Sequence, residues 1–270
     1  MNQSIKNSKT YREISQTMNT DIFKKKIEYS FDKYAGNYDS RTSLQKEIMF
    51  VLLHFLYQEI SITNKKKKNH LLDLGCGTGE LSNILIKKLN FNKIHLLDLS
   101  SQMLNVAKKK INKDNVLFDR NDFDSFCQFD DYDIIVSNMA LHWSANFMVF
   151  IERILNQMRK NTIFIFSIPD NKSFSFLKKV KLEELINKFP EKEIVLKRIT
   201  EEFDCKVHEK TFFEEAFSLL DFFKNIKKIG ANVSNRSINF RKLLELRKYC
   251  FKEPIKINYN INFFIIKKNE

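Results

Sequence analysis

Short apolar runs alternate along this chain with longer segments in which apolar residues recur every three or four positions. The runs are bounded by turn residues and are typical of buried strands; they cover His70–Leu74, Lys93–Ser100, Asn115–Arg120, Tyr132–Leu141 and Asn161–Pro169. The segments between them predict amphipathic helices at Gly79–Leu89, Ser101–Asn112, with Ser100 or Ser101 as its N-cap, and Asn146–Lys160. Strands that alternate with helices predict an α/β fold with a parallel sheet and helices on both faces.

The segments before and after these five strands are also predicted to form helices and strands. A helical segment over Asp21–Ile60 precedes the first strand. After Pro169 the pattern predicts helices over Phe174–Phe189, over Phe213–Ile229 with Gly230 as C-cap, and over Ser237–Cys250. It predicts strands over Cys205–Phe213 and Ile255–Lys268. We therefore expect a mobile extension over residues 1–21 and a single domain over 22–270, with a cofactor-binding core at about 66–169, a helical lid and substrate region at about 170–250 and a closing strand at about 255–268.

A glycine-rich loop and three acids mark the strand ends. "HLLDLGCGTGE" (His70–Glu80) carries GxGxG, one residue tighter than the dinucleotide pattern, and no P-loop is present. Asp73, Asp98 and Asp122 each stand at the end of one of the first three strands, where ligands of such sheets bind. An acid beside the loop suits a cationic ligand, the second suits ribose hydroxyls, and the third suits an adenine amino group. Together they point to S-adenosylmethionine.

The net charge and the cysteines bear on the partners and the cellular compartment that we expect. The net charge of +13 allows two interpretations: an acidic partner, or the Lys- and Asn-rich bias of an AT-rich genome. Cys76, Cys127, Cys205 and Cys250 form no CxxC pair, which predicts no metal site and a reduced, cytoplasmic setting. We expect no membrane span and no secretory signal, because no apolar run is long enough. The sequence carries no signal for an oligomeric state.

The motifs "DLGCGTG", "DLSSQML" and "YDIIVSNMALHW" resemble those of class I S-adenosylmethionine-dependent methyltransferases. The resemblance implies a Rossmann-like fold with a mostly parallel seven-stranded sheet, an N-terminal helical cap and a helical lid insertion after strand five. One departure is the absence of the Pro-Gly-Gly turn before the fifth strand, where this chain has "MRKNTIF". The cofactor-binding set that we expect is Tyr38, Gln45, Asp73, Gly75, Cys76, Gly77, Gly79, Asp98, Leu99, Met103, Asp122, Phe123 and Asn138.

Motifs outside this core make the chain resemble one particular family among these methyltransferases. "FDKYAGNYDSRTSLQKEI", "SNMALHWSANF", "FFKNIKKIGAN" and "INYNINFFIIKK" occur in the order typical of the malonyl-[acyl-carrier protein] O-methyltransferase family of biotin synthesis. That resemblance implies methylation of the free carboxylate of a malonyl thioester, carried by an acidic acyl-carrier protein or by coenzyme A, with S-adenosylhomocysteine as the second product. Nucleic acid is not expected as a partner, because neither an [ND]PPY motif nor a Pro-Cys nucleophile is present.

A carboxylate is already ionised at neutral pH, so no general base is required. The substrate-pocket candidates are Tyr34, His142, Trp143, Arg41 and Arg236, the last two as possible partners of the carboxylate. Three alternatives stay open at this point: a methyltransferase of quinones or other small molecules, a non-methylating arginine hydroxylase-type relative in complex I assembly, and a cofactor-holding binding module.

Overall fold

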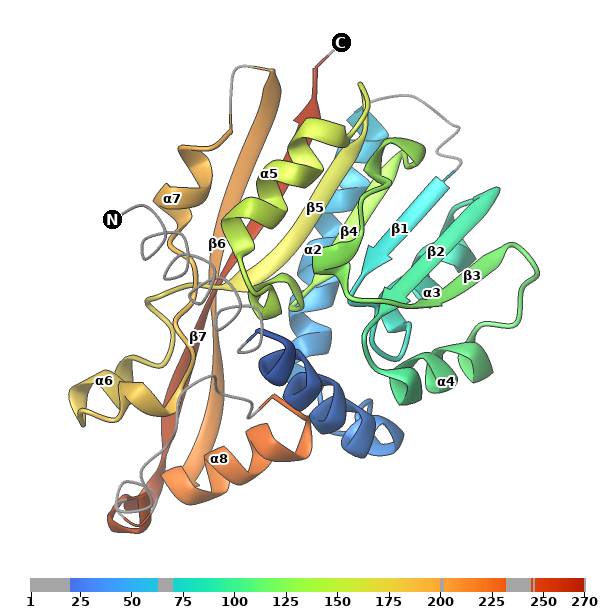
Figure 1. Ribbon diagram of the computed structural model, residues 1–270. Helices are drawn as coiled ribbons and strands as arrows, with labels where there is room; N and C mark the ends of the chain where they lie inside the picture. Colours follow the sequence, from blue (N-terminus) through green and yellow to red (C-terminus); the bar gives the residue numbers. More distant parts are fainter. Residues whose placement is uncertain (1–19, 63–69, 200–201, 232–243, 245, 270) are drawn as a thin grey trace, which may run out of the picture.

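The computed structural model describes residues 20–62, 70–199, 202–231, 244 and 246–269. Its centre is a seven-stranded sheet with the strand order β3-β2-β1-β4-β5-β7-β6 (Figure 1). The strands are β1 (His70–Leu74), β2 (Lys93–Asp98), β3 (Val116–Arg120), β4 (Ile134–Asn138), β5 (Ile163–Pro169), β6 (Phe203–Ser218) and β7 (Cys250–Lys268). The first five run parallel, and β7 pairs antiparallel with both β5 and β6. The expected mostly parallel, seven-stranded Rossmann-like fold is confirmed.

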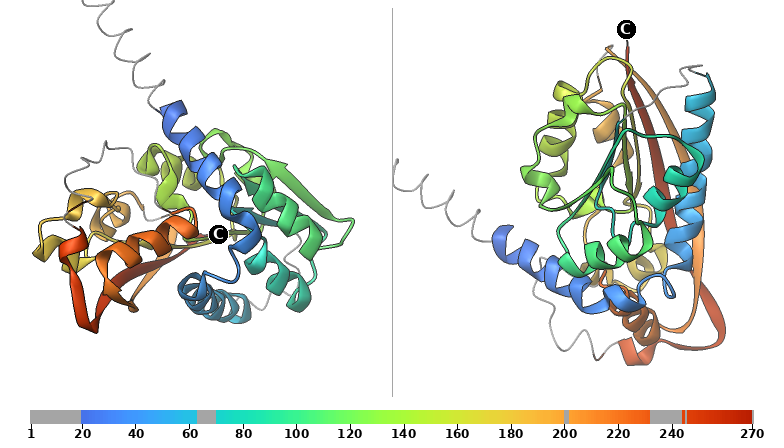
Figure 2. Two further views of the ribbon diagram at one scale, coloured as in Figure 1. Left: turned by 90° about the horizontal axis from the view of Figure 1, so that it is seen from below. Right: turned by 90° about the vertical axis from the view of Figure 1, so that its right-hand side faces the viewer.

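Helices cover both faces of the sheet (Figures 1 and 2). Alternate residues of each central strand point to opposite sides, so Leu71 joins one buried cluster and Leu72 the other. The first cluster includes residues of α2 (Ser43–Ile62), α3 (Glu80–Lys88) and α4 (Ser101–Lys110), and the second includes those of α5 (Phe147–Gln157). Ser100 is the N-cap of α4, since its Oγ accepts from the Met103 amide at 3.1 Å, as predicted.

The N-terminal segment lies across the carboxyl ends of the strands. A helix over residues 20–34, blue in Figure 2, is joined to α2 by a 3-10 turn at Ala35–Asn37. The Lys24 ammonium contacts Asp122 at 2.8 Å, and the Ser100 hydroxyl donates to Asp32 at 2.6 Å. The helical segment expected over 21–60 is therefore two helices. Most of the extension expected over 1–21 lies outside the described residues.

The helix predicted over Phe213–Ile229 begins later than expected. Residues 213–218 continue β6 instead, where Glu214 pairs in register with Ile257 of β7. Helix α8 spans only Leu219–Lys228, and Ser218 is its N-cap, accepting from the Asp221 amide at 3.0 Å. Its end agrees with the prediction: Gly230 has φ +80°, and the amides of residues 230 and 231 donate to the carbonyls of residues 227 and 226.

The lid region is also more broken than expected. Instead of one helix over Phe174–Phe189, the chain forms α6 (Ser175–Lys179) and a 3-10 turn at Glu183–Leu185, separated by Lys181 with φ +58°. A further short helix, α7 (Lys192–Leu196), follows. The helix predicted over Ser237–Cys250 lies largely outside the described residues; within the described part, Leu246–Lys248 form a 3-10 turn.

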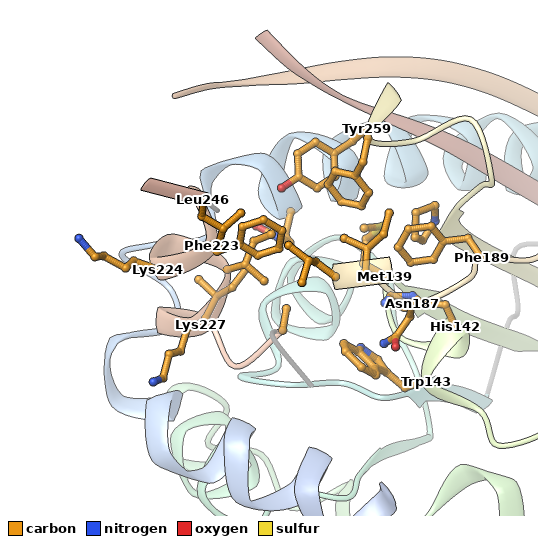
Figure 3. A pocket seen from close by; sticks show the side chains of 18 of the residues that line it. Met139, His142, Trp143, Asn187, Phe189, Phe223, Lys224, Lys227, Leu246 and Tyr259 are labelled. Carbon is orange, nitrogen blue, oxygen red and sulfur yellow. The ribbon is translucent and has the colours of Figure 1, made fainter. Parts of the chain in front are cut away.

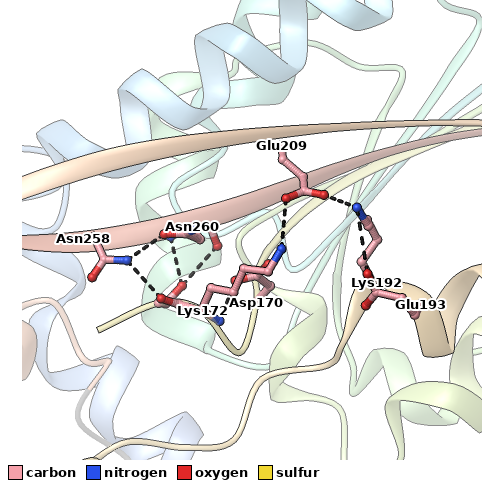
Figure 4. A network of polar contacts seen from close by, with 8 residues as sticks. Asp170, Lys172, Lys192, Glu193, Glu209, Asn258 and Asn260 are labelled. Carbon is pink, nitrogen blue, oxygen red and sulfur yellow. Dashed lines mark hydrogen bonds and ion pairs between the residues drawn. The ribbon is translucent and has the colours of Figure 1, made fainter. Parts of the chain in front are cut away.

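Polar contacts hold the lid region to the long antiparallel strands β6 and β7 (Figure 4). Glu209 of β6 pairs with Lys172 at 3.4 Å and with Lys192. The Asn258 side chain on β7 donates to the Lys172 carbonyl at 2.9 Å, and the Ser173 hydroxyl donates to the Asn260 carbonyl at 3.0 Å. The segment that follows β5 is therefore anchored where it leaves the sheet.

Candidate functional site

The glycine loop between β1 and α3 comes close to the chain that follows β4. Gly75 has φ +69°, and a Cβ there would lie 2.4 Å from Cβ of Ala140. Gly77 has φ +54°, but a Cβ there would meet no protein atom within 4 Å. The first glycine is thus required by packing, whereas the second borders open space in the cavities that lie beside the loop.

Asp98 at the end of β2 holds the loop in place. Its two carboxylate oxygens accept from the amides of Gly77 and Ser100, each at 2.8 Å. Burial raises the pKa of Asp98 to about 6. A carboxylate has about four lone-pair sites, so this carboxylate could still accept from a ribose hydroxyl.

Asp73 at the end of β1 is almost fully buried. It accepts from the Ser82 hydroxyl, one turn into α3, at 2.6 Å. Burial raises the pKa of Asp73 to about 7, and the nearby Asp98 carboxylate adds to the shift. A bound ammonium or sulfonium group would favour the ionised form of both acids. The pair therefore fits a cationic ligand such as S-adenosylmethionine.

The predicted adenine-binding residues line one cavity, here called the adenine end of the predicted donor pocket, and the N-terminal helix closes it. Lys24 is buried, pairs with Asp122 at 2.8 Å and Asp124 at 2.6 Å, and lies 4.7 Å from the centre of the Phe123 ring. The residues that line this end include Tyr38, Gly75, Gly77, Asp98, Leu99, Met103, Asp122, Phe123 and Asn138. Met103 is also a buried core residue.

The residues expected around the methionine moiety line an adjoining cavity, here called the methionine end, beside the start of α2 and the segment that precedes it. Predicted residues that line it are Tyr38, Gln45, Asp73, Gly75, Cys76, Gly77 and Asn138. The Asn138 amide donates to the Gln45 carbonyl at 3.3 Å and accepts from Ser167 at 2.8 Å, which fixes its orientation. Gly79 lines neither cavity; a Cβ there would lie 3.0 Å from Ala107 of α4, so its place in the fold is close packing.

A larger, mostly apolar cavity of about 410 Å³ lies beside the donor pocket (Figure 3). Met139 and Trp143 line both this cavity and the adenine end, and Gln45 lines both this cavity and the methionine end. Most of the wall comes from the lid region, α8 and β7, and includes Phe174, Ile186, Phe189, Leu220, Phe223, Ile226, Leu246 and Tyr259. A ligand in this cavity would therefore reach the predicted donor pocket near the end of β4.

His142 and Trp143 lie together at this junction, on the 3-10 turn Leu141–Trp143 after β4. Trp143 is buried, and its ring packs edge-on against Phe31 at 5.8 Å. Burial lowers the pKa of His142 to about 3, so the imidazole is neutral at physiological pH. Its Nδ1 is inaccessible to solvent and has no hydrogen-bond partner among the described residues.

The remaining candidates lie elsewhere. Tyr34 lines neither end of the donor pocket nor the apolar cavity, and Lys33 lies 5.7 Å from its ring. Arg41 is exposed and borders a neighbouring polar cavity that also includes Glu214. Arg236 lies outside the described residues.

Several residues in or beside these cavities were not predicted from the sequence. Lys24 belongs to a basic stretch that resembles any solvated helix face, so its burial had no signal in the sequence. Met139 adopts φ +54°, an uncommon conformation for a residue with a side chain, at the point where both pockets meet. Ser82 lines none of the three cavities but donates to Asp73, and it could have been found because it lies about one helical turn after the glycine loop.

The fold and this donor pocket define a Rossmann-like methyltransferase. The family model described as "Methyltransferase domain" matches residues 65–228, more than half of the chain, and the chain belongs to that family. No cluster of three or more potential metal ligands occurs among the described residues. Within the same residues, no helix has the length and apolar character needed to cross a membrane.

The similarity to named relatives extends over most of the chain. A malonyl-[acyl-carrier protein] O-methyltransferase of Priestia megaterium is 28% identical and covers 92% of this chain and 98% of its own. The protein of the same name from Acetivibrio thermocellus is 27% identical, with 88% and 89% covered. Among solved structures, the plantazolicin methyltransferase BpumL in complex with SAH has a TM-score of 0.57 at 19% identity, covering 94% of this chain and all of its own. That structural similarity supports the fold.

Proposed function

We propose that this protein transfers a methyl group from S-adenosylmethionine to the free carboxylate of a malonyl thioester. The observation that carries the proposal is the apolar cavity of about 410 Å³ that meets the donor pocket at Met139 and Trp143. The names of the similar proteins from Priestia and Acetivibrio support the choice of acceptor. The product would be a malonyl methyl ester, a primer for pimeloyl and biotin synthesis.

The apolar walls suit this reaction because it removes charge. A carboxylate oxygen attacks the methyl carbon, the carbon–sulfur bond breaks, and its electron pair stays on sulfur. An anion and a sulfonium cation thereby become a neutral ester and a neutral thioether. Since a low-dielectric surrounding disfavours separated charges more than the partly neutralised transition state, a dry cavity lowers the barrier.

No proton needs to move in this step, and the site agrees with that. The carboxylate has a reference pKa of about 4 and is ionised at neutral pH. His142 lies beside Trp143 on the turn after β4, and its lowered pKa of about 3 leaves it a weak base. The work of the protein is therefore to remove water from the carboxylate and to align it with the methyl group.

Neutral polar groups would position the acceptor. Gln45, His142 and Asn187 line the cavity, and Figure 3 shows His142 and Asn187 beside Trp143. A neutral donor orients a carboxylate with less loss of nucleophilicity than a cation, which would stabilise the ground-state charge. The buried Nδ1 of His142 has no partner within the described part of the chain, and buried acceptors without partners are commoner than buried donors. We therefore infer that the proton is on Nε2.

The proposal is tested by a methyl-transfer assay with isotope-labelled S-adenosylmethionine. Malonyl-carrier protein, malonyl-coenzyme A and a demethylated quinone precursor are offered in parallel. Label that appears as an alkali-labile ester on the malonyl substrates supports the proposal. Label on the quinone alone contradicts the acceptor, and binding of the donor without transfer to any acceptor favours a non-methylating role.

A further inference from the structure

Helix α8 presents two lysines in line with its apolar cavity wall. Leu220, Phe223, Lys224 and Lys227 recur at helical spacing on one face, and all four line the cavity. From Leu220 to Lys227 this face runs about 10 Å along the helix. The wall is thus apolar along the first part of α8, and Lys224 and Lys227 add cationic groups along its second half.

These lysines lie at the end of the cavity opposite to the methyl-transfer junction. In Figure 3, His142, Trp143 and Met139 are at one end, while the ammonium groups of Lys224 and Lys227 point outward at the other. Both lysines are exposed. Their aliphatic stems contribute to the cavity wall and their charges remain in water, as is usual for lysines at the edge of apolar surfaces.

The two charges are poorly neutralised. Lys224 pairs with Asp221, three residues earlier, at 2.9 Å, and that pair is exposed on both sides. Lys227 has no ion pair among the described residues. Arg41 and Lys228 border a neighbouring polar cavity together with the Glu214 carboxylate, so the three side chains leave a net positive charge nearby. The outer end of the cavity is therefore a site for an anion.

We propose that Lys224 and Lys227 bind the phosphate of a 4′-phosphopantetheine arm. The inference rests on the proposed function, because a malonyl thioester is carried by this arm both on a carrier protein and in coenzyme A. With the malonyl group at the Trp143 end, the arm extends through the apolar cavity and its phosphate emerges at the last turn of α8. Lysine suits a phosphate that arrives on a flexible arm, since its ammonium acts as a point charge without the fixed geometry of arginine.

The test compares substrates that differ in the phosphate. The variant Lys224→Gln/Lys227→Gln is assayed with malonyl-carrier protein, malonyl-coenzyme A and malonyl-pantetheine, which lacks the phosphate. We expect kcat/KM to fall about tenfold for the two phosphorylated substrates, mainly through KM, and to stay within about twofold for malonyl-pantetheine. Affinity for S-adenosylmethionine should not change, because neither lysine lines the donor pocket.

The matched control is Lys87→Gln/Lys88→Gln, which removes the same charge from the last turn of α3, away from all three cavities. An equal effect on all three substrates would overturn the assignment, as would an effect of the same size from the control. A loss confined to the carrier-protein substrate would also overturn it, by placing the lysines against the carrier surface instead of the phosphate. If the unaltered enzyme methylates no malonyl thioester, the proposed function itself fails.

Discussion

Replacing Asp98 with asparagine tests the predicted donor pocket at the carboxylate that holds the glycine loop in place. The carboxylate accepts from the amides of Gly77 and Ser100, each at 2.8 Å. An asparagine keeps the shape but turns an NH₂ group toward one of these two donors. Hydrogen bonds to a charged acceptor contribute about 1.5–3 kcal/mol. We therefore expect the Kd for S-adenosylmethionine to rise roughly tenfold to 150-fold.

The pH dependence gives a second readout of the same variant. Burial raises the pKa of Asp98 from 3.8 to about 6 and that of Asp73 to about 7. The ligand-free fold thus favours the protonated acids, and the resulting stabilisation is present below about pH 4 and lost as pH rises through about 6 to 7. A cationic ligand favours the ionised acids, so its affinity should weaken as pH falls through the same window. Asp98→Asn should weaken both trends.

Calorimetric titration between pH 5 and 8, with thermal unfolding of the ligand-free protein over the same range, measures both effects. Asp114→Asn, an exposed acid outside both ends of the donor pocket, is the matched control. An Asp98→Asn protein that folds and binds S-adenosylmethionine with unchanged affinity would refute the assignment of this carboxylate to the ribose.

Three further predictions concern the loop, the junction and the charge. Gly75→Ala should destabilise the protein by about 1–3 kcal/mol, since its Cβ would lie 2.4 Å from Cβ of Ala140. Gly77→Val should cost about 1–3 kcal/mol of stability through its positive φ of +54°, although no protein atom lies within 4 Å of its Cβ, and should lose donor binding, as unfolding and calorimetry would show. His142→Gln, which keeps a neutral donor, should retain most of kcat, whereas His142→Phe should lose about tenfold in kcat/KM; inactivity of the glutamine variant would instead indicate a general base. Raising salt from low to physiological concentration should increase KM for malonyl-carrier protein, and an unchanged KM would refute steering by the basic surface.

The central strands and the glycine loop could be predicted because their signals are local. β1 has the predicted bounds, His70–Leu74, since a short apolar run that ends in a glycine turn admits few other structures. The chain lacks a Pro-Gly-Gly turn before β5. It turns at Asn161 instead, which adopts a left-handed conformation with φ +65° that asparagine tolerates.

The lid region could not be predicted in the same way because its structure depends on distant partners. Residues 213–218 were predicted to be helical, and pairing with β7 makes them a strand instead. The apolar cavity is also assembled from segments far apart in sequence, such as Met139, Phe174, Phe223 and Tyr259. Each of these residues by itself looks like ordinary core.

The most direct test of the account is the position of the transferred methyl group. Malonyl-carrier protein is incubated with the enzyme and [methyl-¹³C]S-adenosylmethionine, and the product is examined by mass spectrometry and NMR. The account predicts one added methyl group as an ester on the terminal carboxylate, with S-adenosylhomocysteine in equal amount. An unmethylated malonyl group, with the label found on another acceptor or still on the donor, would contradict it.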